Sequence, residues 1–397
     1  MKRKKLFIVM LFVVVLLVPG WGVAAELRIG LSAEPNSMDP HYHNLTPNNM
    51  MAKYTFDPLI KQDHKQNLKP GLAVSWEPVS DLTWEFKLRR DVKFHDGSPF
   101  TAEDVKFTLE RAPNVPNSPS SFGRFINHVK KVEIVDPHTI RLSTADPFPL
   151  MATYMSGFTI ISKKHGDGAA TKDYNSGKAM VGTGPFKFVE WVPGDRIVYT
   201  RNDDYWDEKP EWEKVIFKPI SNSSARVAAL LAGDVDLIDF VPTADIERLE
   251  KNAKLAIARS VSNRVIYLHI DSDRDVSPFV TDINGNPMTK NPLKDVRVRR
   301  AISIAINRPA IVSKVMEGNA IAAGQLLPDG FFAVSPNLKP VEYDPEGAKK
   351  LMAEAGWGDG FGLTIHGPNN RYVNDAKICQ AVAQMLTRVG IKTKVDT

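Results

Sequence analysis

The sequence predicts a mixed α/β protein of two or three domains, and three observations lead to this prediction. Short segments in which apolar and polar residues alternate, as they do in half-buried strands, recur along the chain. Amphipathic segments with helical spacing lie between them. The length of 397 residues exceeds the ~100–200 of one domain, and 43% apolar with 24% charged residues is ordinary for a globular protein.

The N-terminus predicts a secretory signal peptide over residues 1–25. Four basic residues at positions 2–5 precede an unbroken apolar run from Leu6 to Val18. This run is shorter than the ~20 residues that a membrane-spanning helix needs. Small residues at positions 23–25 then form a cleavage site. We therefore expect an exported protein that works in the bacterial periplasm.

The net charge of +5 belongs mainly to this N-terminal segment. Four of the 51 Lys and Arg residues lie within residues 1–25, which leaves 47 basic residues against 46 acidic ones. A mature chain so close to neutral gives no electrostatic reason to expect a nucleic-acid partner. The single Cys excludes a disulfide within the chain and any zinc site that requires two cysteines.

Periodicity and turn residues predict the elements of the first two thirds of the chain. Strands are expected at 27–31, 83–88, 131–135, 139–142, 186–190, 196–201, 235–238 and 265–270. Helices are expected at 48–56, 101–111 and 223–232. The second of these helices starts with a capping-box pattern, in which Thr101 is followed three residues later by Asp104.

The last third begins with a polar stretch at 271–292, which is expected to form a long exposed excursion. Helices are then predicted at 294–306, 309–317, 345–355 and 375–389, with strands at 362–366 and 391–395. The helix from Asp375 has the clearest pattern, because Ile378, Val382 and Met385 share one face. Gly390 ends this helix as its C-cap.

Motifs of catalysis and nucleotide binding are missing from the sequence. It contains no Walker A motif, no dinucleotide-binding G-x-G-x-x-G and no H-E-x-x-H metalloprotease motif. A nucleophile-elbow pattern fails at Glu34, which stands where a glycine is required. We therefore expect a protein that is not an enzyme and binds no cofactor, with a hydrolase of unfamiliar pattern as a remote alternative.

A few reactive side chains have both a functional and a structural interpretation. His41 and His43 would suit a metal ion on an extended segment, but two surface histidines in a solvated loop explain the pattern better. His95 and Asp96 could act as an acid–base pair, although a turn at Asp96-Gly97 is the simpler interpretation. Cys379 is expected in the core.

The basic residues Arg297, Arg299 and Arg300 lie on one predicted helix. They are expected on its solvated face, with a phosphate or partner patch as the alternative.

Five segments stand out in order along the chain: WEFKLRRDVKFHDGSPFTAEDVKF at 84–107, GTGPFKF at 182–188 with RNDDYW at 201–206, AGDVD at 232–236, DVRVRRA at 295–301, and YDP at 343–345 with EAG at 354–356. Together they resemble the bacterial extracellular solute-binding proteins of family 5, which are the peptide-, nickel- and opine-type receptors of ABC importers. The resemblance extends over essentially all of residues 26–397.

The resemblance implies a two-lobe periplasmic binding protein fold of type II, in its three-domain, peptide-binding subclass. The first lobe would comprise a domain at 26–60 plus 176–265 and an inserted domain at 61–175. The second lobe would occupy 266–397. Members of the family continue well beyond the corresponding point, so this second lobe is expected to be incomplete, with the fold truncated at the C-terminus.

The function implied by the resemblance is that of a monomeric periplasmic receptor. It would bind di- or oligopeptides between the lobes and deliver them to an ABC permease in the inner membrane. A nickel chelate, an opine or a glutathione-like solute is the alternative ligand, and a chaperone or sensor module built on the same clamp is the alternative role.

Three loops are predicted to supply the ligand-binding residues. The family's cleft-facing loops correspond to Asn36, Ser37, Met38 and Asp39, to Asp239 and Phe240, and to Asn369, Arg371 and Tyr372. The third loop follows a predicted strand, and ligands of α/β folds bind beyond the carboxyl ends of strands. Arg371 would hold a peptide carboxylate, because a guanidinium group can donate two parallel hydrogen bonds to it.

Overall fold

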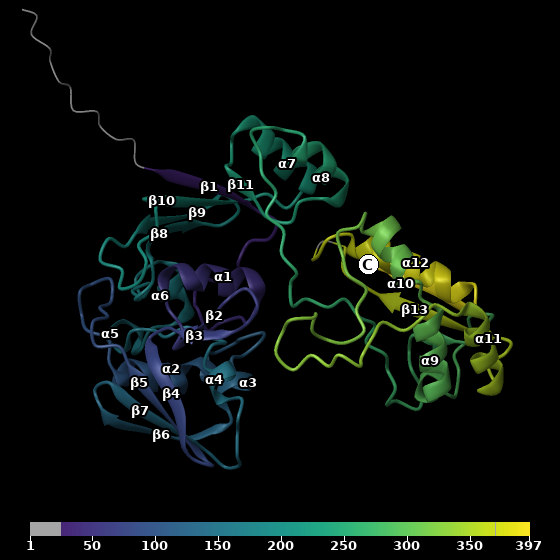
Figure 1. Cartoon of the computed structure of the whole chain (residues 1–397), viewed down its shortest axis with the longest axis horizontal. Coiled ribbons are helices and arrows are strands. Elements are labelled where there is room, and N and C mark those ends of the chain that lie inside the picture. Colours follow the sequence, from purple (N-terminus) through teal and green to yellow (C-terminus); the bar gives the residue numbers. More distant parts are fainter. Residues whose placement is uncertain (1–24, 370) are drawn as a thin grey trace, which may run out of the picture.

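The computed structural model describes residues 25–369 and 371–397, so all of the predicted signal peptide except Ala25 lies outside the described residues. Figure 1 shows two bodies, which we call the first and the second lobe. The first contains the purple to teal part of the chain and the second the green to yellow part. An extended segment, which we call the connecting segment (residues 251–276), joins α8 to the second lobe.

The upper part of the first lobe is built on a five-stranded sheet in the order β11-β1-β10-β9-β8. Its strands are β1 (Glu26–Leu31), β8 (Phe186–Val192), β9 (Arg196–Arg201), β10 (Lys214–Pro219) and β11 (Leu237–Ile238). Its helices are α1 (Thr46–Thr55), α7 (Ser223–Ala232) and α8 (Thr243–Glu250). β1 pairs in parallel with both β10 and β11, so the carboxyl ends of these three strands meet at one edge.

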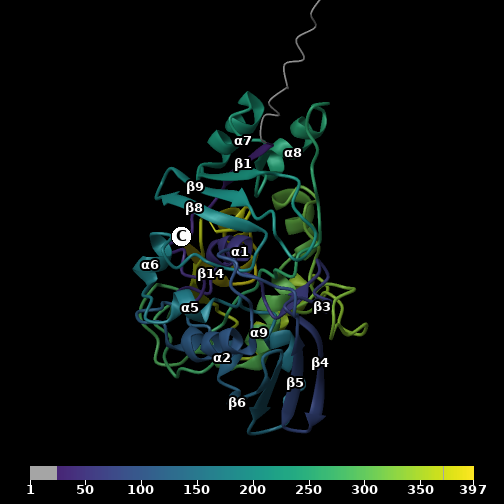
Figure 2. The ribbon, with the colours of Figure 1, turned by 90° about the vertical axis from the view of Figure 1, so that its left-hand side faces the viewer.

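A second sheet, in the order β4-β5-β7-β6, lies at the opposite end of this lobe (Figure 2). Its antiparallel strands are β4 (Ala73–Ser80), β5 (Thr83–Leu88), β6 (Val129–Asp136) and β7 (Thr139–Thr144). β2 (Ile60–Gln62) and β3 (Leu68–Pro70) form a separate ribbon. The helices here are α2 (Ala102–Arg111), α3 (Gly123–Ile126), α4 (Met151–Tyr154), α5 (Lys163–Gly166) and α6 (Thr171–Asn175), with a 3₁₀ turn at Ala112–Asn114.

The second lobe packs helices against a sheet in the order β12-β13-β14. Its strands are β12 (Val280–Thr281), β13 (Phe361–His366) and β14 (Ile391–Asp396). Its helices are α9 (Val296–Ala305), α10 (Arg308–Ala310), α11 (Pro345–Glu354) and α12 (Asp375–Thr387), with a 3₁₀ turn at Pro292–Lys294 and a π-helical turn at Ile311–Val315. β13 and β14 are parallel, and α12 forms the crossover between them.

Most of the predicted elements are confirmed, but one predicted strand is wrong. Residues 265–270 form no strand, although they alternate in polarity. Leu268 and Ile270 pack against the core of the second lobe, whereas Tyr267 is 66% exposed. The alternation therefore reflects an extended chain that is half-buried on one side and pairs with no other strand. The predicted strand at 235–238 is shorter than expected, because only Leu237 and Ile238 pair with β1.

Strands β4 and β10 and helix α8 were not predicted. β4 carries Pro78 and lies at the edge of its sheet, where a residue without a backbone N–H is tolerated. β10 ends at Pro219. In both strands the proline argues against a strand when the sequence is considered alone.

A buried carboxylate joins two of the sequence segments on which the family resemblance rests. Asp57 is 3% exposed and accepts hydrogen bonds from Thr183 Oγ1 (3.0 Å), Tyr205 OH (3.0 Å) and Trp206 Nε1 (2.9 Å). Burial raises the pKa of Asp57, and these donors together with Lys61 oppose the rise. The GTGPFKF and RNDDYW segments therefore both donate hydrogen bonds to Asp57, which belongs to neither segment.

Replacing Gly182 by alanine is expected to destabilise the protein by about 1–3 kcal/mol, the usual cost of overpacking a well-filled site. A Cβ atom at this position would overlap the carbonyl oxygen of Thr55, and the backbone cannot yield as a flexible side chain can. Gly358→Ala is the matched control, since its Cβ would lie in ordinary contact at 3.6 Å from Ala353. Urea unfolding measures the stability of both variants, and equal unfolding midpoints would contradict the expected overlap with the Thr55 carbonyl.

Candidate functional site

The loops that follow β1 and β11 are held together by Asp239. Its carboxylate accepts hydrogen bonds from the Ser32 backbone N–H (2.7 Å) and from Ser32 Oγ (2.9 Å). Arg226 lies behind it, with Nε 3.5 Å from Oδ1. Burial raises the pKa of Asp239, and the bonds from Ser32 together with the charge of Arg226 counteract that rise. The predicted ligand residue Asp239 thus fixes the edge of the sheet where the parallel strands end.

Phe240 follows in a left-handed conformation, with φ of +44°. This conformation is costly for a residue with a bulky side chain, and such strain is found mainly at functional positions. Arg226 stabilises it by donating to the carbonyl oxygens of Asp239 (3.2 Å) and Phe240 (3.0 Å). The ring of Phe240 remains 43% exposed. The structure therefore presents an aromatic side chain at the carboxyl end of β11.

The corresponding loop of the second lobe joins β13 to α12. Asn369 and Arg371 are exposed, and Tyr372 is half-buried against the core of this lobe. The backbone N–H groups of Arg371 and Tyr372 donate to the buried carboxylate of Asp375, at 2.8 and 3.3 Å. Asp375, the first residue of α12, thereby sets the path of the loop and leaves the guanidinium group of Arg371 at the surface.

Side chains of both lobes and of the connecting segment meet at one place, which we call the interlobe seam: Phe240, Thr243, Arg264, Tyr372 and Asn374. Asn374 Nδ2 donates to Thr243 Oγ1 of the first lobe (2.9 Å) and to the Val315 carbonyl of the second (2.9 Å). Asn374 is also left-handed, with φ of +57°. The structure thus brings the second and third predicted loops to the same seam.

The first predicted loop is buried in the first lobe, apart from Asn36, which is exposed. Asp39 is 1% exposed, and its carboxylate accepts hydrogen bonds from Arg111 (2.7 and 3.0 Å) and from Thr171 Oγ1 (2.8 Å). Ser37 Oγ donates to Asn175, and Met38 lies in the core. The side chains of this loop attach the β1 sheet to the neighbouring helices, and the loop's exposed groups are those of Asn36.

The interpretation of His41 as a solvated surface residue is wrong. Its side chain is fully buried, with Nε2 2.8 Å from the carbonyl oxygen of Thr159 and Nδ1 3.2 Å from Arg111. A carbonyl oxygen can only accept, so Nε2 carries the proton and Nδ1 accepts from Arg111. Burial and the adjacent Arg111 charge lower the pKa of His41 to about 4. Both ring nitrogens are occupied, which removes His41 as support for a metal ligand.

His43 is half-buried, with its Nδ1 2.9 Å from Asn36 Nδ2. The turn interpretation of Asp96-Gly97 is confirmed, because Gly97 has φ of +83° and Asp96 accepts a hydrogen bond from the Ser98 backbone N–H (3.0 Å). The ring of the neighbouring His95 is 3.0 Å from the Gly184 carbonyl, which fixes it to the GTGPFKF segment.

Cys379 lies in the core of the second lobe, as predicted. Arg297 and Arg300 are exposed on α9, as the solvated-face interpretation requires. Arg297 pairs with Asp295 (2.6 Å) and also donates to the Glu354 carbonyl (2.7 Å).

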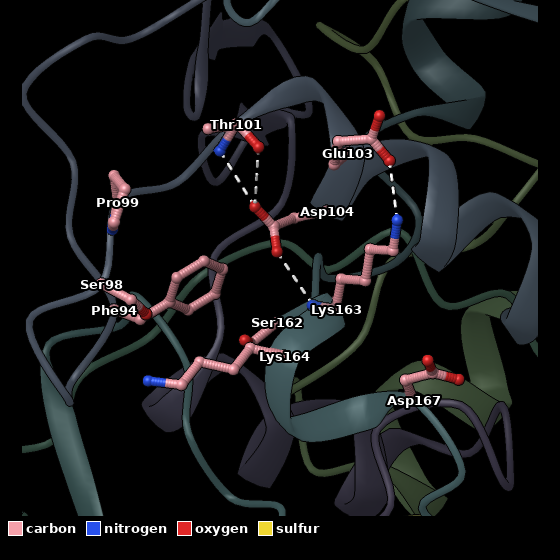
Figure 3. A pocket seen from close by; sticks show the side chains of 10 residues that line it. All are labelled: Phe94, Ser98, Pro99, Thr101, Glu103, Asp104, Ser162, Lys163, Lys164 and Asp167. Carbon is pink, nitrogen blue, oxygen red and sulfur yellow. Dashed lines mark hydrogen bonds and ion pairs between the residues drawn. The ribbon is translucent and has the colours of Figure 1, made fainter.

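A hollow of about 450 Å³ lies away from the seam, beside α2 and α5 (Figure 3). Three of its charged lining residues are held by other residues of the lining. Lys163 Nζ pairs with Glu103 at 2.9 Å, and Asp104 accepts hydrogen bonds from the backbone N–H groups of Lys163 and Thr101, both at 2.9 Å. This hollow is open, and its carboxylates Glu103 and Asp104 already have partners. We therefore place the candidate site at the seam, where strand ends from both lobes converge.

Two further properties concern the described residues as a whole. Within residues 25–369 and 371–397, no group of three or more His, Cys, Asp and Glu side chains is arranged to hold a metal ion. No helix in the same part of the chain has the length and apolar character needed to cross a bilayer.

Known proteins resemble this chain in sequence. The family model described as bacterial extracellular solute-binding proteins, family 5, middle region, matches residues 67–397. The glutathione-binding protein GsiB of Pectobacterium atrosepticum is 30% identical over 383 residues, which cover 95% of this chain and 70% of that protein.

Solved structures resemble it in fold. NikZ from Campylobacter jejuni, in complex with Ni(L-His), superposes with a TM-score of 0.76 at 25% identity, over 94% of this chain and 73% of NikZ. The ABC transporter-associated periplasmic binding protein DppA from Helicobacter pylori, in complex with the peptide STSA, superposes with a TM-score of 0.74 at 27% identity, over 94% of this chain and 74% of DppA.

Proposed function

The chain belongs to family 5 of the bacterial extracellular solute-binding proteins, and we propose that it binds di- or oligopeptides at its interlobe seam and delivers them to an ABC permease. The predicted type II periplasmic binding protein fold is confirmed by the superpositions on NikZ and DppA. The relatives are binding proteins, and the proposed role for this chain likewise involves no catalysis. Export to the periplasm by the signal peptide, and action as a monomer, are part of the same proposal.

One observation supports this proposal more than any other: loops at the carboxyl ends of strands from both lobes converge on one seam. The Asp239-Phe240 loop follows β11, and the Arg371-Tyr372 loop follows β13. Asn374 already links the lobes through its hydrogen bond to Thr243. A peptide bound there would contact both lobes at once, and contacts available only in the closed arrangement favour that arrangement.

The division of the chain into a first-lobe domain at 26–60 plus 176–265, an inserted domain at 61–175 and a second lobe at 266–397 is also part of the proposal. Three separate hydrophobic clusters support it. One is centred on Phe86 and Phe100, the second on Tyr199 and Phe217, and the third on Phe361 and Leu386. Ile161 and Tyr174 belong to the second cluster, so the inserted domain shares a core at its C-terminal border.

A nickel chelate is the second candidate ligand, and the likeness to NikZ is the observation that favours it. Isothermal titration with dipeptides, STSA, glutathione and Ni(L-His) distinguishes the candidates. We expect at least one peptide to bind and every such peptide to be recovered intact after incubation. Cleavage of the peptide would favour the hydrolase alternative, and binding of Ni(L-His) alone would favour the chelate. Failure of all these ligands to bind would contradict the proposed function.

Replacing Arg371 by alanine is expected to weaken binding of whichever peptide the native protein binds by roughly 1.5–3 kcal/mol, the contribution of a hydrogen bond to a charged group. Arg371 is the exposed cation of the β13–α12 loop and suits a peptide carboxylate. Arg388→Ala, at the exposed far end of α12, is the matched control. Equal affinities of the two variants in calorimetry would remove Arg371 from the site.

A further inference from the structure

A second arginine lies at the seam, where three parts of the chain meet. Arg264 belongs to the connecting segment, and its guanidinium carbon lies 5.7 Å from the ring centroid of Phe240 in the first lobe. Its charge also reaches Tyr372 of the second lobe. Burial raises the pKa of Tyr372, with Cys379 and Asp375 adding to the rise, whereas Arg371 and Arg264 lower it. The two guanidinium groups therefore act on the same hydroxyl from different segments.

The described residues do not neutralise the positive charge of these two arginines. Neither Arg264 nor Arg371 forms an ion pair with another residue of 25–369 or 371–397, and both are exposed. By contrast Arg259, five residues before Arg264 on the same segment, pairs with Glu250 at 2.7 Å.

Two carboxylates beside the seam, those of Asp239 and Asp375, already have partners. Asp239 is held by Ser32 and lies 3.5 Å from Arg226, whose charge balances its own. Asp375 is 4% exposed and accepts backbone hydrogen bonds from Arg371, Tyr372 and Ala376. Neither carboxylate is available to Arg264. Arg264 at the seam and Arg371, which directly precedes the seam residue Tyr372, therefore both have hydrogen-bond donors to offer to an anion.

We propose that Arg264 is a specificity-determining residue of the seam and that, together with Arg371, it selects ligands carrying two carboxylate groups. Each planar guanidinium can form a bidentate pair with one carboxylate. A ligand with a single carboxylate leaves one of the arginines without an anionic partner. The inference rests on the proposed function, and it specifies the ligand class: an acidic peptide or another dicarboxylate in preference to a neutral peptide.

A pair of tripeptides that differ by one charge tests this inference directly. Ala-Ala-Glu has two carboxylates, and Ala-Ala-Gln has the same size with one. We expect calorimetry to show that the protein binds Ala-Ala-Glu about tenfold more tightly or better. Arg264→Gln should remove this preference by weakening Ala-Ala-Glu alone, and Arg264→Lys should retain part of it. Arg259→Gln, on the same segment, is the control and should leave both affinities unchanged.

The outcomes separate this inference from the proposed function. Equal affinity of the native protein for the two tripeptides would overturn the inference, as would an Arg264→Gln variant that weakens both equally. So would a ligand screen in which the only peptides that bind carry a single carboxylate. In each of these cases peptide binding itself stands. If none of the peptides binds, the proposed function and the inference both fail. Because Arg264 is exposed, thermal melting of its variants should match the native protein.

Discussion

Replacing Asp39 by alanine is expected to lower the free energy of unfolding by about 3–5 kcal/mol, the usual consequence of removing one partner of a buried ion pair. Asp39 is 1% exposed, and its two oxygens accept hydrogen bonds from Arg111 at 2.7 and 3.0 Å. Burial raises the pKa of Asp39, but the hydrogen bonds and the charge of Arg111, together with His41, outweigh that effect and hold the pKa below its ordinary value. The alanine variant would leave the Arg111 charge in the interior without its anionic partner.

A double-mutant cycle separates the charge pair from the loss of packing. Arg111→Met keeps a long side chain over the ring of Tyr174, which the guanidinium now covers at 4.6 Å. If the buried charge causes the loss, Asp39→Ala combined with Arg111→Met should be clearly more stable than the sum of the single effects predicts. Urea unfolding followed by circular dichroism measures the four proteins. If the two single losses of unfolding free energy simply add in the double variant, the charge pair contributes little, and the loss in Asp39→Ala comes from the cavity that it leaves.

The stability of the protein is expected to fall by roughly 3 kcal/mol between pH 6.5 and pH 4 through His41 alone. Burial, followed by the neighbouring charge of Arg111, lowers the pKa of His41 from 6.5 to about 4. Within this window the unfolded chain binds a proton at His41 and the folded chain does not. Acid therefore favours the unfolded state, and the contribution of His41 is complete above pH 6.5 and is lost as the pH falls toward 4.

His41→Gln isolates this contribution from those of other groups that titrate in the same range. Glutamine does not titrate and can still donate a hydrogen bond to the Thr159 carbonyl, which is now 2.8 Å from Nε2. The variant should be less stable than the native protein at pH 7.5 and should lose that disadvantage as the pH approaches 4. Thermal or urea unfolding at a series of pH values gives the comparison. Parallel stability curves for the two proteins would contradict a buried, neutral His41.

The elements that the sequence predicts well are those defined by neighbouring residues. The hairpin of β8 and β9 turns at Gly194, and α7 starts at the Asn222 N-cap and ends at Gly233, all of which are local signals. The capping box of Thr101 and Asp104 is confirmed by its hydrogen bonds for the same reason.

The environment of His41 could not be predicted, because it is made by residues far away in the sequence. Thr159 is 118 positions from His41 and Arg111 is 70. A short histidine motif with two prolines and two asparagines nearby has the composition of a loop. The loop is indeed irregular, but its core-facing side chains are covered by the neighbouring helices.

The candidate site was predicted in part. The rule that ligands bind beyond strand ends predicted the Arg371 loop, whereas the Asp239 loop was expected from the family resemblance. Arg264 was not predicted. It directly precedes residues 265–270, which have the polarity pattern of a strand, and its contact with Phe240 leaves no local signal in the sequence. A signal for Asn374 does exist: asparagine tolerates the left-handed conformation, and this one directly precedes a helix. Its partner Thr243 is 131 positions away and could not be inferred.

The connecting segment has a mechanical consequence for transport. Over residues 251–276 its backbone belongs to no sheet and to no helix beyond the end of α8, so the lobes can rotate about it without breaking a ladder of hydrogen bonds. Arg264 lies on this segment, which joins the two lobes. A ligand held by Arg264 would therefore bear directly on the segment that joins the lobes, and hinge closure about such a segment moves the distant helices α9 and α11 as part of one body (Figure 1).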